Sequence, residues 1–173
     1  MDEVLARIED LIDDLDQVPR VGFQTYRGYR AEHLLEHDAR AAAACMYCHM
    51  VAEADRRFVD RAGVVPKDIR GLKVWLIRDA AVIRWKKHDE DGNTRNYPTL
   101  QAQKFDRGDD LPGLPAPAIR LSVGYFLNPP QTEIVRVQIA KPRGKGVEWC
   151  AAIVPAGSAG KRWIDVTRQR RFP

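Results

Sequence analysis

The sequence is poor in the residues on which most catalytic and metal centres depend. Among 173 residues there are only 4 histidines and 3 cysteines. So few histidines offer few general bases, and no Ser-His-Asp or Cys-His arrangement can be assembled from local sequence. We therefore expect a protein that acts by binding rather than by catalysis.

Long apolar runs are also missing. No stretch approaches the roughly 18 apolar residues of a membrane helix. Residues 1–16 are rich in carboxylates and contain no separate apolar core, unlike an export signal. An odd number of cysteines without such a signal favours reduced thiols. These absences predict a cytoplasmic protein without membrane contact.

The overall composition is that of a folded protein, with 45% hydrophobic and 30% charged residues. The length suits one hydrophobic core, so we expect a single domain over residues 1–173. Within it we expect a helical part over residues 1–62, a β-rich part over residues 72–167 and a basic tail over residues 168–173.

Apolar periodicity predicts two helices in the first part. Residues 2–17 place apolar side chains at helical spacing, and residues 18–30 contain Pro19 and two glycines, which favours a connector. Residues 31–59 contain neither proline nor glycine, so we expect one helix about 40 Å long.

The second part has the alternation of β-strands. Residues 72–87 predict two strands around a turn near residue 79, and residues 94–117 predict mostly loop. Four more strands are expected, at residues 118–128, 133–141, 147–154 and 162–167. The predicted fold class is α+β, with the helices on one face of a mostly antiparallel sheet of about five to seven strands connected as a meander.

The other face of this sheet is predicted to be wet and basic. Lysines and arginines stand beside aromatic residues in several segments, a mixture that suits phosphate contact and base stacking. The candidate binding residues are Arg84, Lys86, Lys87, Arg95, Tyr97, Arg120, Arg136, Lys161, Arg162, Arg168, Arg170 and Arg171.

Charge is distributed unevenly along the chain. The net charge is −6 for residues 1–60, +4 for residues 61–140 and +6 for residues 141–173. A basic end favours a polyanionic partner. The acidic helical end favours a protein partner or a second copy of the chain, whose basic surface it could meet.

A cluster of histidines and cysteines is the main candidate for a metal or haem. Cys45, Cys48 and His49 match the C-x-x-C-H spacing of haem attachment, and His33 and His37 match H-x-x-E-H. Haem attachment needs export, however, and a continuous helix separates His37 from Cys48 by about 16 Å. We therefore predict no cofactor and no metal, and expect these cysteines to serve as packing residues.

Two other segments resemble sites. Residues 156–162 resemble a phosphate loop but lack its spacing, and predict a hairpin turn. Residues 88–91 are acidic and predict a solvated hairpin tip.

The leading hypothesis is a non-enzymatic cytoplasmic binding or regulatory protein, such as a toxin–antitoxin or phage-defence component, whose basic sheet and tail engage nucleic acid or an acidic protein. One alternative is a nuclease-like enzyme using Lys86, Lys87, His88 and Arg95. Another is a metal or haem protein using the Cys45, Cys48 and His49 cluster.

Overall fold

The computed structural model describes residues 1–78, 80–94, 99–115, 118–157 and 160–168. Within them the chain forms five α-helices, one 3₁₀ helix and seven strands. The helices are α1 (Asp2–Ala6), the 3₁₀ helix η1 (Glu9–Leu11), α2 (Ile12–Arg27), α3 (Ala31–Glu36), α4 (Ala39–Phe58) and α5 (Leu100–Arg107). The strands are β1 (Val64–Ile69), β2 (Leu72–Ile77), β3 (Ala81–Lys87), β4 (Ile119–Leu127), β5 (Ile134–Arg143), β6 (Gly146–Ile153) and β7 (Trp163–Asp165).

All seven strands belong to one curled sheet in which the spatial order follows the sequence order. Every neighbouring pair is antiparallel except β3 and β4, which run parallel. The α+β class and the mostly antiparallel sheet are confirmed, and β2 to β7 fall on the expected strands. The turn expected near residue 79 lies outside the described residues.

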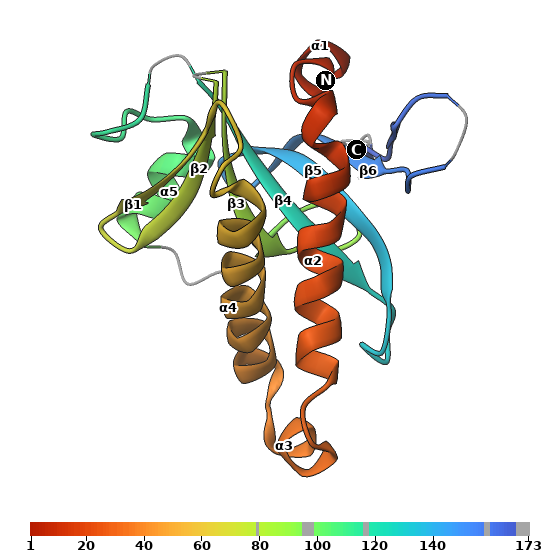
Figure 1. Ribbon diagram of the computed structural model, residues 1–173. Coiled ribbons are helices and arrows are strands. Elements are labelled where there is room, and N and C mark those ends of the chain that lie inside the picture. Colours follow the sequence, from red (N-terminus) through yellow and green to blue (C-terminus); the bar gives the residue numbers. More distant parts are fainter. Residues whose placement is uncertain (79, 95–98, 116–117, 158–159, 169–173) are drawn as a thin grey trace, which may run out of the picture.

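The helices cover the sheet unequally. Helices α2 and α4 run side by side across one face, and α5 lies behind the strands on the other (Figure 1). The larger core fills the space between α2, α4 and the sheet, and Trp75, Trp85 and Tyr125 are among its largest buried side chains. A second, smaller core forms under α5, where Phe105 packs on Val82 and its neighbours.

The first helix predicted, over residues 2–17, is divided in the structure, because α1 ends at Ala6, η1 follows and α2 begins at Ile12. The connector predicted over residues 18–30 is also wrong, since most of it is helical. Helix α2 continues past Pro19 to Arg27. A proline inside a helix costs about 3 kcal/mol, but Val18, Gly22 and Tyr26 are buried along the same stripe and offset that cost. Gly22 lets the two helices approach closely, because a Cβ there would lie 3.0 Å from Cγ of Met50.

The predicted single helix over residues 31–59 is also wrong, because it is divided at Asp38. Helix α3 ends at Glu36, and Asp38 is the N-cap of α4. Its Oδ1 atom accepts hydrogen bonds from the backbone N–H groups of Arg40, at 2.9 Å, and Ala41, at 2.7 Å. An aspartate that satisfies these otherwise unpaired donors favours a helix start over helix continuation.

Residues 94–117, predicted to be mostly loop, contain one helix that the prediction did not include, α5. They form part of the crossover between β3 and β4, so a pure meander is not what the chain adopts. Parallel neighbours require such a crossover, since a tight turn cannot join them. Residues 64–69, not expected as a strand, pair with β2 as β1. In the described part of the chain, no helix is long and apolar enough to cross a membrane.

Candidate ligand-binding site

The expected exposed basic face of the sheet is largely covered. Arg84 is 1% exposed and Arg120 is 8% exposed. Both guanidinium groups stack on Phe105 of α5, at 4.7 and 5.7 Å from the ring centroid. The prediction that these two arginines are available to a ligand is therefore wrong, because the crossover helix packs over them.

Arg84 also pairs with a carboxylate from the covering helix. Its Nη2 atom lies 2.5 Å from Oδ1 of Asp106. Burial lowers the pKa of Arg84 and raises the pKa of Asp106, while their mutual attraction opposes both shifts. Arg84 thus belongs to a structural ion pair.

The basic carboxyl-terminal part meets the acidic amino-terminal part of the same chain. Nζ of Lys161 lies 2.7 Å from a carboxylate oxygen of Asp2. Arg162 pairs with Asp13, and this pairing lowers the pKa of the Asp13 carboxyl. These contacts compensate the charge asymmetry within one molecule.

Arg136 and Arg168 lie against the segment that follows β3. Nη2 of Arg136 donates to the carbonyl oxygen of Glu90 at 2.6 Å. Arg168 lies 2.5 Å from the Glu90 carboxylate and 3.2 Å from that of Asp91. Of the other predicted binding residues, Arg95, Tyr97, Arg170 and Arg171 lie outside the described residues.

Two of the three histidines of the proposed metal cluster have tyrosine hydroxyls as hydrogen-bond partners. The hydroxyl of Tyr26 lies 3.2 Å from Nδ1 of His37, and that of Tyr29 lies 2.8 Å from Nε2 of His49. The break at Asp38 does provide the bend that convergence would require. Even so, no group of three or more potential ligands that could hold a metal occurs among the described residues.

Cys45 and Cys48 are free thiols in the described structure, and Cys45 packs against the larger core. Cys45 is partly buried, whereas Cys48 is exposed. The expectation that both are packing residues therefore fails for Cys48. His33 is exposed beside Glu36, with Nδ1 3.8 Å from that carboxylate.

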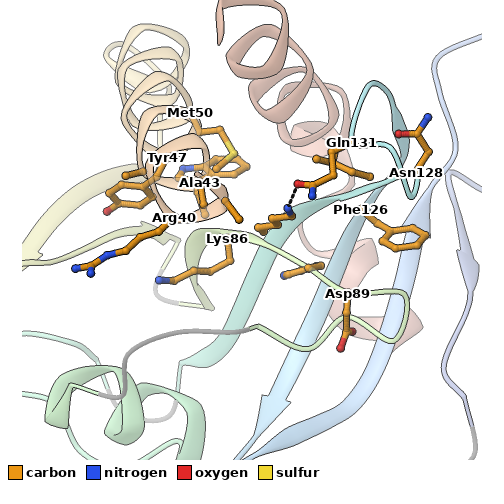
Figure 2. A pocket seen from close by; sticks show the side chains of 15 residues that line it. Arg40, Ala43, Tyr47, Met50, Lys86, Asp89, Phe126, Asn128 and Gln131 are labelled. Atoms are coloured by element: carbon orange, nitrogen blue, oxygen red, sulfur yellow. Dashed lines mark hydrogen bonds between the residues drawn. The ribbon is translucent and has the colours of Figure 1, made fainter. Parts of the chain in front are cut away.

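A pocket of about 710 Å³ lies between the amino-terminal half of α4 and the carboxyl ends of β3 and β4. Figure 2 shows Arg40, Tyr47 and Lys86 toward one side of it, and Phe126, Asn128 and Gln131 toward the other. The apolar lining also includes Ala39, Ala43, Ala44, Met50, Trp85 and Leu127, and the remaining lining residues are Lys87, His88 and Asp89.

The strand pairing explains why the pocket lies at this position. Strand β2 pairs with β3 only from Ala81 to Ile83, so the rest of β3 has β4 as its described neighbour. Because β3 and β4 are parallel, their carboxyl ends reach the same edge of the sheet. They are also very close there, since a Cβ on Gly124 would lie 2.0 Å from the carbonyl oxygen of Lys86.

Among the described lining residues, three side chains are cationic: Arg40, Lys86 and Lys87. Nζ of Lys86 lies 5.9 Å from the ring centroid of Tyr47. Nζ of Lys87 donates to the side-chain carbonyl of Gln131 at 2.7 Å. These cations come from α4 and from β3, so the fold assembles them from distant parts of the sequence.

Asp89, the one carboxylate among the described lining residues, faces its own loop. Oδ1 of Asp89 accepts hydrogen bonds from the backbone N–H groups of Asp91, at 3.0 Å, and Asn93, at 2.9 Å. Figure 2 shows the Asp89 side chain directed away from the other labelled side chains. The pocket therefore favours an anionic ligand with an apolar or aromatic part.

His88 is not the exposed hairpin residue that the sequence predicts. It is 3% exposed, and its Nε2 atom lies 2.8 Å from Oγ of Ser122. Burial, with a further contribution from the charge of Arg84, lowers the pKa of His88 to about 4. A buried imidazole that stays neutral near pH 7 does not favour the nuclease-like alternative, which needs an accessible acid or base.

The sequence predicted only part of this site. Lys86 and Lys87 were among the candidates, but Arg40, Tyr47 and Phe126 were not. No local signal connects these three residues, because α4 and β4 meet only in the folded chain. In comparisons with known proteins, no family model, no curated protein and no solved structure matches this chain.

Proposed function

We propose that this chain is a non-enzymatic binding protein whose pocket receives a nucleotide unit of a single-stranded nucleic acid. Phosphates are neutralised by lysine and arginine, and bases stack on aromatic rings. The observation that carries the proposal is the convergence of Arg40, Lys86 and Lys87 with Tyr47 and Phe126 around one pocket.

The size of the pocket supports a small ligand unit. Its volume of about 710 Å³ falls in the range of roughly 300 to 1,000 Å³ that is usual for small-molecule sites. A concave site of this kind suits one unit of a strand better than the flat surface of an acidic protein. Binding without chemistry fits a regulatory role, and a cytoplasmic toxin–antitoxin or phage-defence component is the setting that we propose.

Several other predicted binding residues form ion pairs outside the pocket, which supports the pocket as the binding site. Lys161 and Arg162 meet carboxylates of the amino-terminal helices, and Arg168 meets those of Glu90 and Asp91. Arg40, by contrast, is exposed at the pocket, and the carboxylate of Asp89 in the described lining accepts hydrogen bonds from its own loop.

Fluorescence anisotropy with a labelled single-stranded oligonucleotide tests the proposal. Wild-type protein should bind more weakly as salt rises, because each neutralised phosphate releases counterions. Arg40→Ala should weaken binding and reduce the magnitude of the log–log salt slope by about 0.7. Phe126→Leu should weaken binding by about 1 to 3 kcal/mol if its ring carries a stacked base.

Arg168→Ala is the matched control, since it removes the same charge from a position outside the pocket lining. It should leave the affinity within about twofold of wild type. If Arg168→Ala abolishes binding while Arg40→Ala and Phe126→Leu have no effect, the pocket is not the binding site. Absence of binding at low salt would overturn the nucleic-acid proposal altogether.

A further inference from the structure

Gln131 belongs to the pocket lining and lies in the turn that joins β4 to β5. Its backbone φ is +57°, a left-handed conformation that is uncommon for a residue with a side chain. The N–H group of Gln131 donates to the carbonyl oxygen of Asn128 at 2.9 Å, which holds the turn. Backbone strain of this kind persists where the surrounding structure fixes it, and it clusters at ligand-binding sites. Here the strained residue carries an amide side chain of the pocket.

The contact with Lys87 determines which end of the Gln131 amide meets a ligand. Nζ of Lys87 donates to Oε1 of Gln131 at 2.7 Å (Figure 2). An ammonium group has no acceptor, so the amide oxygen and not the amide nitrogen faces it. This orientation directs the NH₂ group, which only donates, away from Lys87 and toward a ligand.

Asn128, the other amide among the described lining residues, serves its own turn. Its Oδ1 atom accepts from the backbone N–H groups of Thr132, at 2.8 Å, and Glu133, at 3.2 Å. Its Nδ2 atom donates to Oγ1 of Thr132 at 3.0 Å. Both ends of this amide are therefore engaged within the turn. Of the two amides, Gln131 is the one that can contact a ligand without breaking these bonds.

An aromatic ring on the same hairpin is held in place beside the pocket. Phe126 is in the lining, and Arg136 lies directly opposite it on β5. The Arg136 guanidinium lies 5.2 Å from the ring centroid, and its Nη2 atom donates to the carbonyl oxygen of Glu90 at 2.6 Å. Arg136 is not among the described lining residues, so it supports the ring from outside the pocket. A ring that is fixed before binding loses little freedom when a base stacks on it.

We propose that Gln131 makes the pocket selective for bases that carry a keto group, namely guanine, thymine and uracil, over adenine and cytosine. The inference rests on the proposed function and names the nucleotides that the pocket receives. Guanine carries a keto oxygen where adenine carries an amino group, and thymine and uracil carry one where cytosine carries an amino group. An NH₂ donor pairs with a keto oxygen. An amino group in the same place would set donor against donor and leave both unpaired.

Fluorescence anisotropy with labelled homopolymers of equal length, oligo-dT and oligo-dC, measures this preference near neutral pH. We expect oligo-dT to bind about tenfold more tightly, since the mismatch leaves a donor unpaired. One central guanine in an oligo-dC strand, compared with one central adenine, tests the purines in the same way. The strand with guanine should bind more tightly.

Two matched variants separate the amide from its charge and its position. Gln131→Glu keeps an oxygen for Lys87 but replaces the NH₂ group by an acceptor, so it should abolish the preference for oligo-dT. Asn128→Asp also converts a lining amide into a carboxylate, and it should keep the preference even if the added charge weakens binding to both homopolymers. Gln131→Gly suits the left-handed backbone, so it should fold and still lose the preference.

The outcomes distinguish this inference from the proposed function. Equal affinity for oligo-dT and oligo-dC, with binding still weakened by Arg40→Ala, would overturn the base preference and leave the proposed function standing. An unchanged affinity ratio in Gln131→Glu would also overturn it, because the amide would then not contact a base. Loss of the preference in Asn128→Asp as well would attribute the effect to charge and overturn the role of Gln131. Absence of binding to all of these oligonucleotides would overturn both proposals.

Discussion

The guanidinium of Arg84 and the carboxylate of Asp106 form an ion pair that fastens the crossover helix α5 to the sheet, with Nη2 2.5 Å from Oδ1. The Arg84 side chain is 1% exposed and that of Asp106 is 20% exposed. Nε and Nη1 of Arg84 are buried and have no hydrogen-bond partner among the described residues. The pair closes the sheet face that the sequence presents as a basic surface.

Removing the acid from this pair should cost more than removing the base. Asp106→Asn leaves a buried guanidinium without a counter-charge and should lower the free energy of unfolding by about 3 kcal/mol. Arg84→Met removes the buried charge with its unpaired donors, and Asp106 can turn to water, so its cost should be smaller. Urea unfolding of both variants measures the difference. Lys141→Met, which breaks the exposed pair with Glu148, is the control and should cost less than about 1 kcal/mol.

His88 should make the protein sensitive to mild acid. Its pKa is about 4 in the folded chain, below the ordinary 6.5 of the unfolded chain. Above pH 6.5 both states are neutral, and no penalty arises. As pH falls from 6.5 toward 4, the unfolded chain takes up a proton that the folded chain does not, so the folded state loses up to about 3 kcal/mol.

His88→Gln isolates this effect, because glutamine does not titrate. The difference in unfolding free energy between wild type and His88→Gln should change by about 3 kcal/mol between about pH 7 and pH 4, with the variant gaining relative to wild type. The aspartates with lowered pKa, Asp2, Asp10 and Asp13, weaken both proteins alike in acid and cancel in the difference. If the unfolding free energies of wild type and His88→Gln change equally with pH, the lowered pKa of His88 is contradicted.

Gly124 should tolerate no side chain. An added Cβ would lie 2.0 Å from the backbone oxygen of Lys86 and 2.9 Å from Cδ2 of His88. Gly124→Ala therefore has to separate β3 from β4 and should cost more than about 3 kcal/mol or prevent folding. Gly146→Ala is the control, since its nearest neighbour is 3.9 Å away. Similar melting temperatures for both variants would show that the strands are not held this closely.

Asp38 should stabilise the start of α4 through its two backbone hydrogen bonds. Asp38→Ala should lower the free energy of unfolding by about 1 kcal/mol, whereas Asp38→Asn keeps a capping oxygen and should cost much less. Thermal unfolding followed by circular dichroism compares them. Equal losses in the two variants would mean that the carboxylate acts through its charge and not as a cap.

Local pattern predicted much of this fold but little of the site. Alternation located β2 to β7, because a sheet with one face on the helices imposes a period of two. It could not locate α5 or the parallel pair, since the packing of Phe105 on Val82 depends on contacts distant in sequence. The break at Asp38 was readable as an N-cap, but the alanines after it favoured a continuous helix.

The pocket could not be predicted from the sequence for a related reason. The basic residues were expected to be exposed, but Arg84 is buried beside Asp106. Lys161 and Arg162 pair with carboxylates of the same chain. Which basic residues line the pocket depends on contacts between segments that are distant in the sequence. No single segment therefore predicts the site.

The most direct test of the central claim is a map of backbone amide chemical shifts in ¹⁵N-labelled protein titrated with a single-stranded oligonucleotide. We predict that the largest changes occur at Ala43, Tyr47, Lys86 and Phe126, which line the pocket from α4, β3 and β4. Changes confined to Lys161 to Arg168, with none at the pocket, would contradict the claim.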